Sequence, residues 1–128
     1  MIDHIAFPVG DIARSTAFYL KALAPLGIEI IMEVSAEETG HGAAVGFGAN
    51  RKPFFWIGEG PLPQSHLHVA FAAQNRAEVD AFYRAAMEAG VTNNGMPGLR
   101  PDYHANYYGA FVLDPEGNNI EAVCHLPA

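Results

Sequence analysis

Three residues of types that commonly bind divalent metal ions lie in apolar, strand-like parts of the sequence. His4 and His68 each lie within a short apolar run, and Glu121 lies in the sequence Asn-Ile-Glu-Ala-Val. A carboxylate in a buried strand is costly unless it is paired or coordinates a metal. Two imidazoles and one carboxylate leave coordination positions for a substrate and suit Ni(II), Zn(II), Mn(II) or Fe(II). We therefore expect a metal site at these three residues; the alternative is that Glu121 faces solvent at a sheet edge.

A second group of polar and aromatic residues lies in and just after the Gly- and Pro-rich stretch 94–106. Arg100, Tyr103, His104 and Tyr107 fall within eight residues of one another. A connection of this length is usually functional, so we expect a lid over the site. Arg100 and Tyr103 would then bind substrate, while His104, Tyr107 or Glu121 would move a proton. The alternative is a surface loop that is packed by its own tyrosines.

Three further residues have less definite assignments. His125 has the same strand alternation as Glu121 and could reach the edge of the pocket, or could lie at a frayed terminus. Cys124 has the opposite alternation and is expected in the core. His41 lies in a Gly-rich turn and is assigned no role.

An internal repeat relates the two histidines. Residues 4–19 (HIAFPVGDIARSTAFY) align without gaps on residues 68–83 (HVAFAAQNRAEVDAFY), and seven of the sixteen positions are identical. His4 and His68 therefore occupy the same position in two copies of one unit. The position in the first copy that matches Glu121 falls near Phe55 or Trp56. Neither residue can bind a metal, so we expect both to line the substrate pocket or fill the core.

Each copy contains the pattern strand, helix and three strands. Asp11 and Asn75 are suited to cap the two helices, and Gly27 and Gly90 to end them. The helix spacing predicts two buried faces, formed by Ser15, Phe18, Tyr19, Ala22, Leu23 and Leu26, and by Val79, Phe82, Tyr83, Ala86 and Met87. Strands are expected at residues 2–9, 28–34, 43–48, 53–57, 67–73, 91–93, 107–113 and 119–125, with a tight turn at 114–117.

The expected fold class is therefore α+β, with paired βαβββ modules that form a cupped mixed sheet. The modules cover about residues 1–60 and 66–128 of a single domain, and their uncovered faces would enclose a cavity. Whether the modules pair within one chain or across a dimer stays open.

Composition excludes several classes of function. The formal net charge of −7 disfavours nucleic acid and anionic membranes as partners. A single cysteine permits no internal disulfide, and no signal peptide or membrane-spanning apolar run is apparent, so we expect a cytoplasmic protein. The sequence also lacks a phosphate-binding loop, a nucleophile elbow and a dinucleotide-binding fingerprint. Only 16% of the residues are charged, which indicates that a partner chain buries some surface.

The segments DHIAFPVGDIARSTAFY, HLHVAFAAQNRAEVDAFY and LDPEGNNIEAV resemble the vicinal oxygen chelate superfamily. This group includes glyoxalase I, extradiol dioxygenases, fosfomycin-resistance enzymes, methylmalonyl-CoA epimerase and bleomycin-binding proteins. The resemblance implies a glyoxalase/bleomycin-resistance/dioxygenase-like fold, a divalent metal at His4, His68 and Glu121, a small-molecule substrate and a homodimer. Bacterial glyoxalase I has a further glutamate where this chain has Phe55 or Trp56, which puts standard glyoxalase I activity in doubt.

The sequence thus favours a metal-dependent lyase or isomerase of glyoxalase-like type. Such an enzyme acts on a small oxygenated substrate by metal chelation and proton transfer. One alternative is an extradiol-like dioxygenase that uses Fe(II), although such enzymes are usually longer. The other is a non-catalytic protein that binds a drug or metabolite. The bleomycin-binding relatives are of this kind and lack the metal ligands, whereas all three residues are present here.

Overall fold

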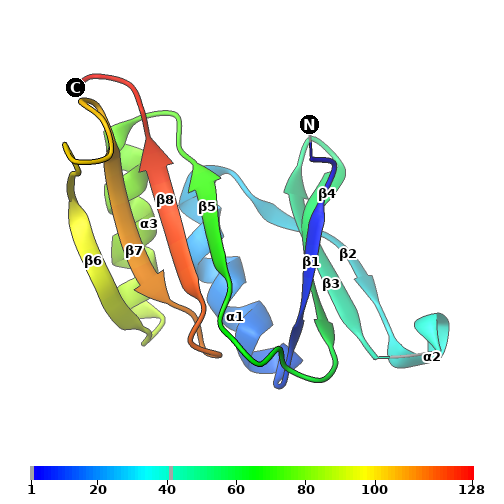
Figure 1. The fold of residues 1–128 in the computed structure, drawn as a ribbon. Coiled ribbons are helices and arrows are strands. Elements are labelled where there is room, and N and C mark those ends of the chain that lie inside the picture. Colours follow the sequence, from blue (N-terminus) through cyan, green and yellow to red (C-terminus); the bar gives the residue numbers. More distant parts are fainter. Residues whose placement is uncertain (1, 41) are drawn as a thin grey trace.

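The computed structural model describes residues 2–40 and 42–128, and these form two sheets of four strands, each with one long helix (Figure 1). The elements of the first half are β1 (Ile5–Val9), α1 (Ile12–Leu23), η1 (Ala24–Leu26), β2 (Glu29–Val34), α2 (Ala36–Thr39), β3 (Ala44–Ala49) and β4 (Lys52–Glu59). Those of the second half are β5 (His68–Ala72), α3 (Arg76–Glu88), β6 (Thr92–Leu99), β7 (Tyr108–Leu113) and β8 (Asn119–Cys124).

Both sheets have the same topology, which confirms the repeat. The strand orders are β1-β4-β3-β2 and β5-β8-β7-β6. In each sheet the first strand pairs with the last in parallel, and the other pairs are antiparallel. The register sets Ala6 opposite Trp56 in the first sheet and Ala70 opposite Glu121 in the second. Trp56, and not Phe55, is therefore the counterpart of Glu121.

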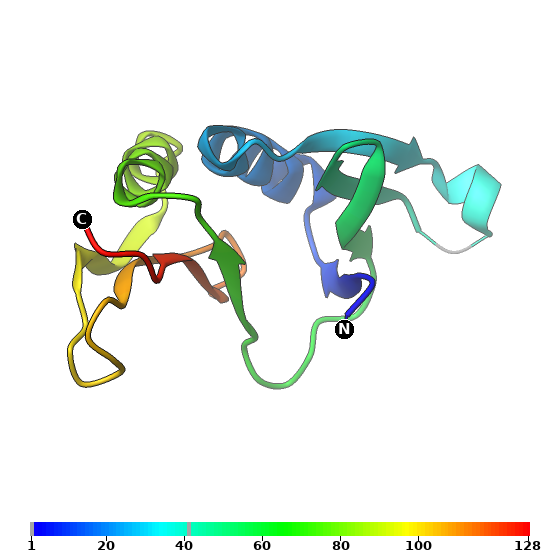
Figure 2. The same ribbon diagram turned by 90° about the horizontal axis from the view of Figure 1, so that it is seen from above.

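The two long helices lie side by side on the same side of the two sheets (Figure 2). The core fills the space between helices and sheets, and aromatic rings continue it from one half to the other. Phe55 packs edge-on against Phe7 and Phe71, with ring centroids 5.3 and 5.2 Å apart. Each sheet thus keeps a second face turned away from the helices, called here its open face.

The local signals for the helices are confirmed. The side chains of Asp11 and Asn75 accept hydrogen bonds from the backbone N–H of Arg14 and Glu78. Gly27 and Gly90 adopt left-handed φ values of 76° and 88°, which a residue with a Cβ adopts only with strain.

The expected helix faces are buried with three exceptions. Leu26 and Tyr83 are only half-buried, and Met87 is 36% exposed. Met87 belongs to the last turn of α3, next to an open hollow that Pro97 also lines, so the periodic pattern continues beyond the residues that the core can cover.

Side chains of the turn at residues 114–117 form hydrogen bonds that link the second half of the chain to the first. Asp114 is buried, and its Oδ1 accepts hydrogen bonds from the backbone N–H of Glu116 and Asn118. Its Oδ2 accepts a hydrogen bond from the Tyr19 hydroxyl of α1 at 2.6 Å. Glu116 in turn accepts a hydrogen bond from the backbone N–H of Gly10 at 2.8 Å.

The expectation of a long loop over residues 94–106 is wrong for its first half. Strand β6 extends to Leu99 and pairs with β7 through two register shifts, at Asn93/Gly95 and Gly95/Gly98. Glycine, with a φ of 152° at Gly95, lets the strand depart from regular geometry and resume pairing. The irregular connection is therefore short, from Arg100 to Tyr107. No helix in the described parts of the chain is long and apolar enough to cross a membrane.

Candidate functional site on the open face of the second sheet

Glu121 is a buried carboxylate on the open face of the second sheet. Its neighbours Ile120 and Ala122 alternate with it and belong to the hydrophobic core. The Glu121 side chain is only 1% exposed, so the alternative of a solvent-facing glutamate is wrong. Burial of a carboxylate requires partners, and it has two: His68 Nε2 lies 2.8 Å from Oε1, and the Tyr107 hydroxyl donates to Oε2.

Tyr107 is suited to remain a hydrogen-bond donor to Glu121. Burial, together with the hydrogen bond to the Glu121 carboxylate, raises the pKa of the Tyr107 phenol well above its ordinary value. The ring fits there because β7 has no side chain at Gly109: a Cβ at Gly109 would lie 3.1 Å from Tyr107 Cε1 and 3.4 Å from Glu121 Oε2. Sequence reasoning missed Gly109, although a glycine within a strand signals a close approach.

Arg100 places a cation next to this pair. Its guanidinium lies over the Phe111 ring, with 5.4 Å from Cζ to the centroid, and donates to the Met96 carbonyl at 2.7 Å. The His68 ring lies 6.4 Å from the same Phe111 ring. Phe111 therefore adjoins both the cation and the imidazole, and its apolar type did not distinguish this position from core packing in the sequence.

The remaining residues of the connection gather around Tyr107. The rings of Tyr103 and His104 meet it edge-on at 4.9 and 5.4 Å, and His125 meets it at 5.2 Å. His125 thus reaches this group, as its alternation with Glu121 suggested. The connection is packed by its own tyrosines, as the alternative interpretation expects, and these same residues adjoin Glu121. The expected lid and the roles of its residues stay predictions.

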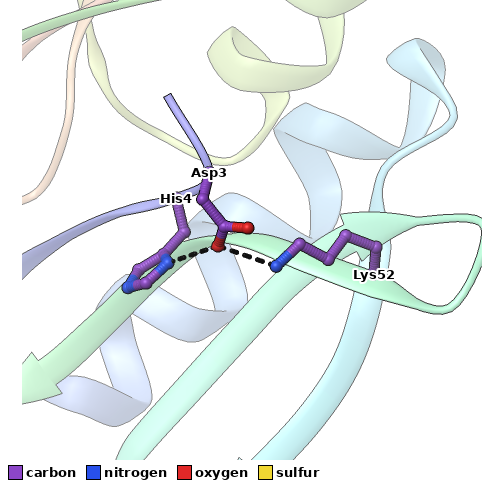
Figure 3. Close-up of polar contacts among 3 residues, drawn as sticks. All are labelled: Asp3, His4 and Lys52. Atoms are coloured by element: carbon purple, nitrogen blue, oxygen red, sulfur yellow. Dashed lines mark hydrogen bonds and ion pairs between the residues drawn. The ribbon is translucent and has the colours of Figure 1, made fainter. Parts of the chain in front are cut away.

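His4 lies apart from the His68–Glu121 pair. Its Nδ1 lies 2.7 Å from Asp3 Oδ1, which also accepts a hydrogen bond from Lys52 Nζ at 2.8 Å (Figure 3). Lys52, and to a lesser degree His4, lower the pKa of the Asp3 carboxyl. Over residues 2–40 and 42–128, no three His, Cys, Asp or Glu side chains lie close enough to hold a metal ion. His68 and Glu121 suit a divalent metal by donor type and by proximity, but this chain does not bring the expected third donor to them.

The aromatic candidates of the first half have different positions. Phe55 is fully buried in the core, the second of the two roles expected for it. Trp56 lies over Gly46, where a Cβ would come within 2.8 Å of the indole. Together with His4 it lines a hollow of about 530 Å³ on the open face of the first sheet.

Two assignments concern single residues. Cys124 is buried in the core, as expected. His41, to which no role was assigned, lies outside the described residues.

The comparisons with known proteins identify the family. The model of the glyoxalase/bleomycin resistance protein/dioxygenase superfamily matches residues 1–122, and the chain belongs to this superfamily. A glyoxalase/bleomycin resistance protein from Albidiferax ferrireducens has a similar structure, with 28% identity, a TM-score of 0.78, and coverage of 97% of this chain and 98% of that one. No curated protein sequence matches significantly.

Two structures of named function share the fold at lower identity. One is a mutant of the fosfomycin resistance protein FosX from Listeria monocytogenes, complexed with Mn(II) and 1S,2S-dihydroxypropylphosphonic acid (21% identity, TM-score 0.69, 96% of this chain and 88% of that one). The other is a glyoxalase I mutant from Zea mays (22% identity, TM-score 0.70). The match covers 95% of this chain and 46% of that one.

Proposed function

We propose that the protein is a metal-dependent lyase or isomerase of glyoxalase-like type that acts on a small oxygenated substrate. The observation that supports this most directly is the Glu121 carboxylate, which is buried and paired with His68 and Tyr107 on an open face. Such a carboxylate costs free energy to bury, which favours a functional over a structural role. A buried acid next to a group whose pKa is strongly shifted is a common feature of reactive sites.

His68 and Glu121 would hold the divalent metal, with His4 as the third donor. Ni, Zn, Mn and Fe(II) all suit this set, and FosX, whose structure holds Mn(II), is a relative with the same fold. Bound there, the metal would stabilise negative charge on an oxygen of the substrate. The side chain of His68 is 54% exposed, which leaves room for a substrate next to it.

The other residues of the group have roles that follow from their chemistry. Arg100 and Tyr103 bind the substrate, with the guanidinium attracting an anionic part. The Tyr107 hydroxyl donates a hydrogen bond to Glu121 and so fixes the orientation of that carboxylate. His104, whose ring meets Tyr107, moves a proton at a ring nitrogen. Trp56 covers the open face of the first half.

We also propose that the chain forms a homodimer. The inner edge strands β1 and β5 pair with only one neighbour each in their sheets, and unpaired edges are usually covered. His4 of a second copy could then meet the His68–Glu121 pair of the first, since the two sit apart within one chain.

A second candidate is a non-catalytic protein that binds a drug or metabolite. It is favoured by the same separation of His4 from Glu121, together with the apolar hollow of about 530 Å³ next to Trp56. A hollow of that size accommodates a small organic molecule.

Metal retained after desalting tests the two candidates. The protein is purified without chelator, and its metal content is compared with that of His68→Ala, Glu121→Gln and His4→Ala. We expect about one tightly held equivalent in the parent, lost in all three variants, while His66→Ala, which changes another exposed histidine, retains it. No retained metal after loading with Ni, Zn, Mn or Fe(II) would contradict the enzyme proposal and favour the binding protein.

Oxygen uptake separates the remaining alternative. An extradiol-like dioxygenase loaded with Fe(II) consumes oxygen when given a catechol, whereas a lyase or isomerase does not. Uptake that depends on His68 and Glu121 would replace the proposed reaction class.

A further inference from the structure

His104 and His125 form a pair that is separate from the His68–Glu121 pair. His104 belongs to the connection that follows β6, and His125 comes directly after β8. Their ring planes are nearly parallel, inclined by 22°, and the ring centroids lie 4.6 Å apart. His104 Nε2 and His125 Nδ1 face each other at hydrogen-bond distance. Both residues are exposed, so neither is a core histidine.

The facing nitrogens are suited to share a cation. A contact between two ring nitrogens requires that one holds a proton and the other presents its lone pair. A divalent metal can replace that shared proton when the two exposed rings move apart to the roughly 3–4 Å between nitrogens that two metal–nitrogen bonds of about 2.0–2.1 Å require, and both imidazoles are then neutral and present lone pairs to it. We propose that His104 and His125 form a second metal site, for an imidazole-preferring ion such as Cu(II), Ni(II) or Zn(II).

The surroundings support an exchangeable site more than a tight one. Two protein donors leave the other coordination positions to water, which weakens binding relative to sites with three or four donors. The net charge of −7 favours accumulation of cations around the chain. Tyr107 meets both imidazoles edge-on, at 5.4 and 5.2 Å, and limits how far either ring can turn away.

A metal at this pair would join two separate segments of the chain. The connection from Arg100 to Tyr107 would be fixed to the end of β8, next to the phenol that donates to Glu121. Tyr103 in this connection is 62% exposed and is a cleavage site for chymotrypsin. Metal binding should therefore slow cleavage after Tyr103.

Copper titration of the double variant His68→Ala/Glu121→Gln tests the proposal independently of the proposed function. In this background we expect one equivalent of Cu(II), with a spin-resonance signal that shows two nitrogen donors. Adding His104→Ala or His125→Ala should weaken binding at least tenfold, while adding His66→Ala should leave it unchanged. Unchanged thermal unfolding without metal checks that each variant is folded.

Chymotrypsin provides the second measurement. Cu(II) or Zn(II) should slow cleavage after Tyr103 severalfold, and His125→Ala should abolish this protection. Binding that persists in both the His104→Ala and His125→Ala variants would overturn the site, as would equal loss in the His66→Ala control. A failure here leaves the tightly held metal at His68 and Glu121 as a separate question, because that is measured in the parent after desalting.

Discussion

The two oxygen atoms of Glu121 have different partners, an imidazole and a phenol, and the carboxylate is almost fully removed from solvent. Deleting a hydrogen-bond donor to such a group costs more free energy than the net contribution of an ordinary hydrogen bond, because the deletion leaves a buried acceptor unsatisfied. Single substitutions of the two partners of Glu121 should therefore affect the site strongly.

Tyr107→Phe should reduce the free energy of unfolding by about 1–3 kcal/mol, since Glu121 Oε2 loses its donor and stays buried. Urea unfolding measures the change. Tyr103→Phe is the control, and it should cost less than about 0.5 kcal/mol because Tyr103 is largely exposed. Equal effects of the two substitutions would show that the Tyr107 hydroxyl does not stabilise Glu121.

Tyr19 should make the protein sensitive to alkaline pH. Burial, with the negative charge of Asp114, raises the pKa of Tyr19 well above 10.0. The folded state therefore holds the phenol proton more tightly than the unfolded state does. Its contribution is fully present below pH 10 and is lost as the pH rises above that value.

Urea unfolding at pH 8 and pH 11 checks this expectation. The parent should lose up to about 1.4 kcal/mol per pH unit above 10 through this group. Tyr19→Phe should be less stable at pH 8, because the hydrogen bond to Asp114 is missing, but should show a smaller alkaline loss. The same pH slope in both proteins would exclude Tyr19 as the titrating group.

At the scale of elements, β6 shows what the sequence could and could not predict. The helices were predictable because Asp11 and Asn75 act locally, on backbone groups three residues away. For most of strand β6 (Thr92–Leu99) the sequence predicts a loop, because glycine, proline and asparagine favour turns. Its pairing with β7 is a tertiary effect that overrides these propensities.

Gly95→Ala tests the irregular geometry of β6. The φ of 152° strains a residue with a side chain, and the new Cβ would come within 2.9 Å of Phe111 Cδ1. We expect a loss of about 1–3 kcal/mol in the free energy of unfolding. Gly98→Ala is the matched control, because the nearest atom to its Cβ would be the flexible end of Arg100 at 3.1 Å, and the Met96 carbonyl oxygen lies at an ordinary 4.0 Å. Equal stability of the two variants would contradict the assigned backbone geometry.

At the scale of the whole molecule, the repeat predicted two copies of one module and the order of helix and strands along the chain within each, but not the order of the strands in the sheets. It also placed His68 and Glu121 on one sheet, where they pair. The repeat defines equivalent positions inside a module, but not how the modules are oriented. Whether His4 meets Glu121 depends on that orientation, so the sequence could propose three candidate donors but could not say whether one chain assembles them.

The two halves should unfold together. The Phe55–Phe71 contact and the bonds that Asp114 and Glu116 make to the first half all cross between them. Trp56 fluorescence reports the first half, and exchange of the β8 backbone amides reports the second. Glu116→Ala should shift both transitions to the same lower urea concentration, and two separate midpoints would show that the halves are independent units.

The correspondence between Trp56 and Glu121 means that one strand position carries different chemistry in the two modules. In a repeated unit a single copy is enough to supply a given side chain, so the equivalent position of the other copy is free to hold a different residue. In this chain one of the two positions carries an indole that lies over Gly46, and the other carries an acid that pairs with an imidazole and a phenol. Two halves of the same topology thus present two different open faces, one shaped by an aromatic ring and the other by a buried acid.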